Sequence, residues 1–216
     1  MPLRYIRSLR KVKNIMKKYY DIHKMTDNPF LNMYQIDAID TKGNDFCYYF
    51  ASRNDEDKIK IRTRSIKPEG IVIYAVTKEE QPRLVLIRQY RYPIDEYLYE
   101  LPAGLIDGDE DPGTAAAREM KEETGLDFTE YTGGSECYRR PYFLGPGLTD
   151  ETDSTVYGTV SGRISDALTE DTEEIQVILA DKEKVRQVLA NERVSMRGAY
   201  LMMHFLHSET PFAFLE

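Results

Sequence analysis

Residues 104–126 read GLIDGDEDPGTAAAREMKEETGL, and this stretch decides the fold. Its second half predicts a helix because three terminal signals frame it. Asp111 suits the N-cap, Pro112 suits the first helical turn, and Gly125 suits the left-handed residue that ends a helix. The preceding loop is rich in glycine and adds further carboxylates. The stretch therefore predicts a loop and helix that gather acidic side chains.

The helix places Glu119, Glu122 and Glu123 within one turn near its C-terminal end. Like charges at this spacing cost about 0.2–0.5 kcal/mol per pair, and acids in a last turn oppose the helix dipole by about 0.3–1 kcal/mol each. Arg118 offsets part of this cost if it pairs with Glu122. A hard divalent cation such as Mg²⁺ or Mn²⁺ suits oxygen ligands on one helical face and turns the repulsion into attraction. A solvated acidic face is the alternative.

The composition describes one sizeable core with a small appended element, since 41% of 216 residues are hydrophobic. No apolar run is long enough to span a bilayer, which excludes a membrane-embedded protein. The net charge of −8 makes nucleic acid an unlikely partner, and an anionic substrate requires local cations. Cys47 and Cys137 form no CxxC pair and no secretory signal opens the chain, so we expect a cytoplasmic protein.

The first twenty residues carry seven basic side chains and no acid. Apolar residues recur every three or four positions up to Tyr19, which predicts an amphipathic helix. The favoured interpretation is a docked helix with a solvated basic face. An organelle transit peptide and a nucleic-acid contact are the alternatives.

Short strands are predicted after this arm, at residues 28–40, 44–53 and 58–64. They form an antiparallel meander too small for a core of its own, so the rest of the chain or a second copy must cover its apolar face. Further strands are predicted at residues 70–76, 83–91, 97–104, 136–144, 154–162 and 174–180. Helices are predicted at 182–192 and 196–207, with Asp181 and Ser195 as N-caps. This irregular order favours a mixed sheet packed between helices.

The long acidic stretch resembles the Nudix box at every defined position, G-x5-E-x7-R-E-M-x-E-E-x-G-L from Gly104 to Leu126. The resemblance implies a Nudix hydrolase of the α/β class, with an α/β/α sandwich and mixed sheet. Such enzymes use Mg²⁺, with Mn²⁺ also possible here, to hydrolyse a nucleoside diphosphate linked to another group. Carried over by position, Glu119 and Glu123 are the implied principal metal ligands, and the carbonyl of Ala103 is another ligand. Glu122 is a further ligand or a helper. Arg118 would orient the carboxylates.

Three flanking motifs resemble the ADP-ribose pyrophosphatase branch: QYR at 89–91, ELPAG at 100–104 and GPGLTDE at 145–151. We expect residues 1–65, with the basic helix, to form a dimerisation domain and residues 66–216 to form a catalytic domain. The resemblance extends to the stretch NPFLNMYQIDAID…YYFASR at residues 28–53, which is similar to an extra β-domain that two subunits of this branch exchange, and it therefore implies a homodimer. It implies that Arg91 binds phosphate, that Glu100 binds the ribose side or supports the metal site, and that the loop of Pro146 lies near the terminal sugar. Arg53 is a second anion contact or a surface arginine.

The implied reaction is attack of a metal-activated water on ADP-ribose, which gives AMP and ribose 5-phosphate. Glu173 is the preferred proton acceptor or extra ligand, with Asp171 and Glu170 as alternatives. ADP-glucose, GDP-mannose or a wider range of nucleoside diphosphate sugars stay open as substrates. A sensor that binds ADP-ribose without cleavage and a nucleoside triphosphate hydrolase are the remaining alternatives.

Overall fold

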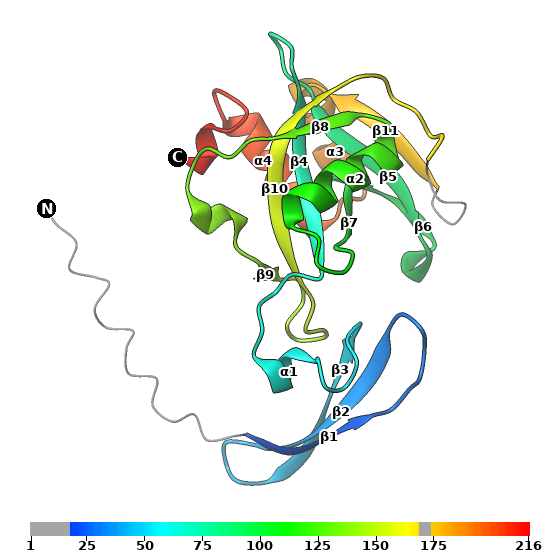
Figure 1. Cartoon of the computed structure of the whole chain (residues 1–216), viewed down its shortest axis with the longest axis vertical. Helices are drawn as coiled ribbons and strands as arrows, with labels where there is room; N and C mark the ends of the chain where they lie inside the picture. Colours follow the sequence, from blue (N-terminus) through cyan, green and yellow to red (C-terminus); the bar gives the residue numbers. More distant parts are fainter. Residues whose placement is uncertain (1–17, 169–173) are drawn as a thin grey trace, which may run out of the picture. The chain divides into compact units, whose positions relative to one another are not determined.

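A computed structural model describes residues 18–168 and 174–216 of the chain, which form two compact units (Figure 1). One unit comprises the described residues up to Arg64 together with Gly145–Asp150. The other comprises Ser65–Leu144 and Glu151–Glu216. Most of the predicted basic helix lies outside the described residues, which begin at residue 18. Its last predicted residue, Tyr19, begins a strand instead.

The first unit is a three-stranded antiparallel sheet. Its strands are β1 (Tyr19–Lys24), β2 (Asn32–Ile39) and β3 (Asp45–Ser52). On one face Tyr34 stacks on Phe50 of the paired strand, with ring centroids 5.3 Å apart. Ile22 and Ile59 complete this buried cluster. The unit thus has a core of few residues, as its short strands dictate.

The prediction of a strand at residues 58–64 is wrong, because this segment forms the short helix α1 (Lys60–Thr63). The amides of Arg62 and Thr63 donate to the carbonyl of Ile59 and close the helical turn. Ile59 is fully buried, and Ile61 also packs on the cluster of Tyr34 and Phe50. Two apolar residues two apart are too short a pattern to separate a strand from one turn of helix.

The second unit is a mixed sheet in the order β11-β5-β4-β10-β8, with β6 beside β5, β7 beside β4 and β9 beside β10. Its strands are β4 (Gly70–Thr77), β5 (Leu84–Arg91), β6 (Glu96–Glu100), β7 (Ala103–Leu105), β8 (Asp127–Glu130), β9 (Tyr142–Phe143), β10 (Thr152–Ser161) and β11 (Ile175–Ala180). Its helices are α2 (Pro112–Thr124), α3 (Lys182–Asn191) and α4 (Met196–His207). Among the strands of the described residues, only β4 and β10 pair in parallel.

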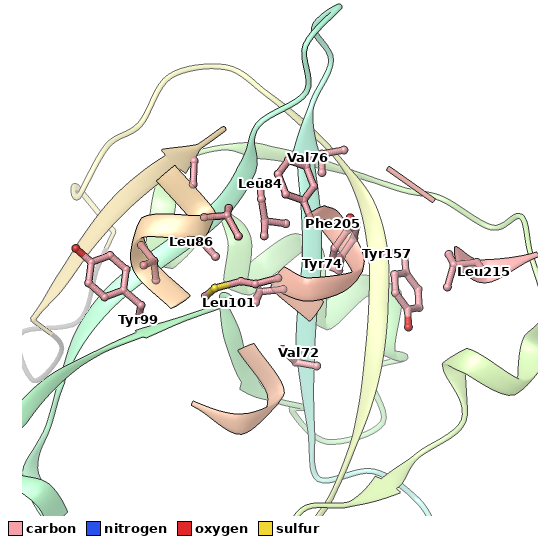
Figure 2. Close-up of a cluster of buried hydrophobic side chains, with 14 residues drawn as sticks. Val72, Tyr74, Val76, Leu84, Leu86, Tyr99, Leu101, Tyr157, Phe205 and Leu215 are labelled. Atoms are coloured by element: carbon pink, nitrogen blue, oxygen red, sulfur yellow. The ribbon is translucent and has the colours of Figure 1, made fainter. Parts of the chain in front are cut away.

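Helices cover both faces of this sheet (Figure 1). Every residue of β4 is buried, and alternate residues belong to two different clusters. Ile71 and Ile73 pack with Met120 of α2, whereas Val72 and Tyr74 pack with residues of α3 and α4 (Figure 2). Side chains that alternate along a strand thereby build two apolar layers. The predicted α/β/α sandwich with a mixed sheet is confirmed.

The predicted helix termini agree with the hydrogen bonds. The side chain of Asp111 accepts from the amides of the first turn of α2, and Asp181 and Ser195 do the same for α3 and α4. Gly125 ends α2 with φ of 74°. Residues 136–144 are not the predicted single strand, because only β9 is extended. Ser135 caps a 3₁₀ turn at Glu136–Arg139 before it.

No helix among the described residues is both long and apolar enough to cross a membrane.

Candidate active site

The helix α2 and the strand β7 bring two of the predicted glutamates together. Glu123 is only 3% exposed, and its Oε2 accepts a hydrogen bond of 3.2 Å from the backbone N–H of Ala103. One turn earlier, Glu119 lies against the next residue of β7, because a Cβ built at Gly104 would be 1.9 Å from the carboxylate carbon of Glu119. Gly104 therefore leaves the space that this carboxylate fills.

Arg118 holds the remaining acids in place. Its Nη1 donates to Oε1 of Glu119 at 2.9 Å and to Oε2 of Glu122 at 3.0 Å. Its Nη2 donates to Oε2 of Glu110 and to the carbonyl oxygen of Leu105, both at 2.9 Å. Arg118 thus makes the predicted contact with Glu122 and also ties the helix to the loop before it.

These contacts answer the electrostatic problem of three acids in the last turns of a helix. Hydrogen bonds to Glu110 first, and then to Glu119 and Glu122, raise the pKa of Arg118 above its ordinary value. In return, the hydrogen bond from Arg118 holds the pKa of Glu110 below its ordinary value. Charge-assisted bonds of this kind are stronger than neutral ones. One arginine therefore donates hydrogen bonds to three carboxylates of the site.

The donor set of α2 and β7 fits a hard divalent cation in its chemistry. Its side-chain donors are carboxylate oxygens, the ligands that Mg²⁺ and Mn²⁺ prefer, and Glu119 fills a cradle that a Cβ would close. Among the described residues, no three acidic, histidine or cysteine side chains are arranged as a ready metal site. The present hydrogen bonds explain this, since Arg118 binds Glu119 and Glu122 while Glu123 binds the backbone of β7.

Arg91 and Glu100 form an ion pair, in which Nε of Arg91 donates to Oε2 of Glu100 at 2.6 Å. Val85 of β5 packs under α2, so the alternation along β5 puts Ile87 and Arg91 on the same face. Glu100 is the register partner of Ile87 and shares that face. The structure thus places this pair on the side of the sheet that carries the acidic helix.

The other predicted residues lie elsewhere. Arg53 and Pro146 are exposed and belong to the first unit, where the amide of Ala51 donates to the carbonyl of Leu148 and ties the loop of Pro146 to β3. Glu173, Asp171 and Glu170 lie outside the described residues.

One ion pair was missed by the sequence analysis. Asp153 of β10 is 8% exposed and hydrogen bonds to Arg197 in the first turn of α4. Burial lowers the pKa of Arg197, while the charges of Glu100 and Glu151 raise it. An acid at the start of a mainly apolar strand was the available signal, since a buried charge requires a partner.

The profile of the NUDIX domain matches residues 66–197, which are more than half of the chain. The chain belongs to the Nudix family. The predicted family is confirmed, and the matched segment contains the whole of α2 and all of the acidic side chains that Arg118 binds.

The relatives of this Nudix chain include proteins with pyrophosphatase names. It is 36% identical over 140 residues to "Putative nudix hydrolase 2" of Caenorhabditis elegans, covering 59% of this chain and 60% of that protein. It is 32% identical over 84 residues to an ADP-ribose pyrophosphatase of Bacillus subtilis, covering 39% and 42%. The match therefore spans about half of the length of these relatives. A crystal structure titled "ADP compounds hydrolase" shares the fold, with a TM-score of 0.61, 16% identity, and coverage of 86% of this chain and 89% of that one.

Proposed function

We propose that this Nudix protein hydrolyses the diphosphate bond of ADP-ribose and releases AMP and ribose 5-phosphate. The observation that carries the proposal is the convergence of Glu119 and Glu123 on adjacent residues of β7. A carboxylate that lies in the space left open by a glycine of β7 is unexpected for a merely solvated acidic helix. The names of relatives such as the Bacillus subtilis ADP-ribose pyrophosphatase support the choice of substrate.

In this proposal Glu119, Glu123, Glu122 and the carbonyl of Ala103 hold Mg²⁺, with Mn²⁺ as an alternative. A bound cation of this kind neutralises diphosphate oxygens and lowers the pKa of a water. Arg118 orients the carboxylates through the bonds described above. A proton acceptor is also needed, and Glu173 stays a prediction for that role because it lies outside the described residues.

The anionic substrate also needs cations from the protein. Arg91 suits a phosphate, because its guanidinium keeps further donors beside the bond to Glu100. Glu100 then fixes the orientation of Arg91 and supports the ribose side. We keep Arg53 as a second anion contact and the loop of Pro146 as a contact for the terminal sugar, both as predictions.

We further propose a homodimer through the first unit, with residues 1–65 as the dimerisation domain and 66–216 as the catalytic domain. The apolar face of its sheet is only partly covered. Tyr34 and Phe50 are buried, but Phe46 and Tyr48, which lie on the same face of β3 as Phe50, keep about four tenths of their surface exposed. A second copy is the occupant that the small sheet favours. Light scattering at micromolar concentration should give the mass of two chains, and a monomer would refute the dimer.

The free, exposed thiols of Cys47 and Cys137 support a reducing location, and we propose the cytoplasm.

The experiment that tests the function is a hydrolysis screen over ADP-ribose, ADP-glucose, GDP-mannose and NADH, with and without Mg²⁺ and with product identification. We expect ADP-ribose to be the best substrate and activity to need the cation. Comparable rates on several nucleotide sugars would indicate the broader pyrophosphatase. Binding of ADP-ribose without cleavage would indicate a sensor and contradict the proposal.

A further inference from the structure

The second unit contains a pocket of about 400 Å³ on the face of the sheet opposite α2. We call it the α4 pocket. Its lining includes Val72 of β4, Tyr142 and Phe143 of β9, Asp153 of β10, and Arg197 and Tyr200 of α4. The volume is within the range of small-molecule sites. None of the predicted site residues lines this pocket.

The walls of the α4 pocket are mainly aromatic and aliphatic. Tyr142, Phe143 and Tyr200 are about half exposed, although rings of this size gain much from burial. Exposed aromatic rings around a pocket are suited to stack on a flat heteroaromatic group, and every nucleobase offers such a face. The rings therefore favour a planar ligand over a sugar.

The polar end of the pocket is the ion pair of Asp153 and Arg197. A carboxylate accepts several hydrogen bonds and a guanidinium donates five, so the pair retains capacity for a ligand. A Cβ at Gly70 would be 2.8 Å from Oδ1 of Asp153, so this glycine leaves room for the carboxylate. An acceptor beside a donor matches the edge of a nucleobase, on which N–H groups alternate with acceptor atoms.

The α4 pocket lies at the same end of the sheet as the acidic helix. Val72 lines the pocket and is the register partner of Ala103, whose N–H binds Glu123 on the other face. Arg197 is close enough to Glu100 and Arg91 for their charges to act on it. A ligand that fills the pocket therefore ends near the residues assigned to the diphosphate.

We propose that the α4 pocket binds the nucleobase of the substrate, an inference that rests on the proposed function. Stacking on Tyr200 and hydrogen bonds to Asp153 and Arg197 would hold the base. The diphosphate would extend toward Arg91 and the carboxylates of α2.

Two measurements on the full chain test this inference. Saturation-transfer NMR with adenosine, guanosine and ribose 5-phosphate reports which group binds without catalysis. Steady-state kinetics with ADP-ribose then compare Tyr200→Ala with Met203→Ala. Both residues are exposed on α4, but only Tyr200 lines the pocket, so Met203→Ala is the matched control.

We expect transfer to the base protons of a nucleoside and none to ribose 5-phosphate. Loss of one stacking ring should weaken nucleoside binding and raise KM about tenfold at unchanged kcat, whereas Met203→Ala should resemble the parent. Nucleoside binding that is equal in Tyr200→Ala and the parent would overturn the inference, as would binding of ribose 5-phosphate alone. Glu123→Gln should still bind the nucleoside, because Glu123 does not line the pocket. If the parent cleaved none of the screened compounds but bound a nucleoside through Tyr200, the proposed function would be wrong. The inference about the α4 pocket would still hold.

Discussion

The two faces of the mixed sheet differ in what their side chains can do at the end where β4 begins. On the α2 face, Glu119 and Glu123 reach β7 and Arg118 binds the neighbouring acids. On the opposite face, aromatic rings surround one ion pair between Asp153 and Arg197. Because residues alternate along a strand, one sheet supports both environments without mixing them.

This difference predicts which kinetic parameter each face of the sheet controls. On the α2 face, the carboxylate of Glu119 fills the space beside Gly104, and Glu123 is buried. The rings of the α4 pocket are half exposed and less constrained. We therefore expect changes on the α2 face to lower kcat and changes on the α4 face to raise KM. A change of KM alone on the α2 face would break this comparison.

The largest effect is expected for Glu123→Gln. The substitution keeps the size of a buried side chain but removes the charge that we propose to bind the cation. We expect kcat for ADP-ribose to fall about a thousandfold, the scale of losing one electrostatic catalytic contact, with an unchanged circular dichroism spectrum. Glu122→Gln is the graded comparison, because Glu122 is 43% exposed and should matter less. A nearly normal rate for Glu123→Gln would remove the metal role.

A smaller effect is expected for Gly104→Ala. The new methyl group would overlap the carboxylate of Glu119 and displace it from β7. Misplacement by about 1 Å costs about a hundredfold in rate, so kcat should fall on that scale. Gly108→Ala in the same loop is the control, since a Cβ there meets nothing within 4 Å, although its φ of +55° adds strain. Equal kinetics for both variants would show that Glu119 is not held by this contact.

The smallest effect concerns the pH dependence of stability. Arg118 lowers the pKa of Glu110 below the ordinary 4.5, so the folded state favours the ionised acid. A lowered folded pKa stabilises the protein above the unfolded value, and this contribution is lost as the pH falls through the folded pKa. The urea unfolding free energies of the parent and of Glu110→Gln should therefore differ at pH 7 and converge as the pH falls through the folded pKa of Glu110, which lies below 4.5. A difference that stays constant down to about pH 3, roughly 1 unit below the reference pKa of Glu, would contradict an ionic origin.

Local signals made most of the fold and half of the site predictable. Asp111 and Gly125 frame α2 through bonds within a few residues, and Arg118 with Glu122 follows from helical spacing. The segment at residues 58–64 was mistaken for a strand because its helical turn depends on burial against β2 and β3.

The ion pair of Asp153 and Arg197 could not be predicted from local signals, because 44 positions separate its residues and only the packing of α4 on the sheet joins them. The α4 pocket was missed for the same reason. Its rings come from β9 and α4, and a tyrosine in either segment fits a core as well as a binding surface. Contacts between distant segments are therefore what the structure adds.

The central claim is that the glutamates of α2 bind the divalent cation, and electron paramagnetic resonance of Mn²⁺ tests it most directly. The free Mn²⁺ signal is titrated with the full chain and a non-hydrolysable methylene analogue of ADP-ribose, and again with Glu119→Gln/Glu123→Gln. We predict that the parent removes the free signal and that the double variant leaves it. Equal Mn²⁺ binding by both proteins would contradict the account.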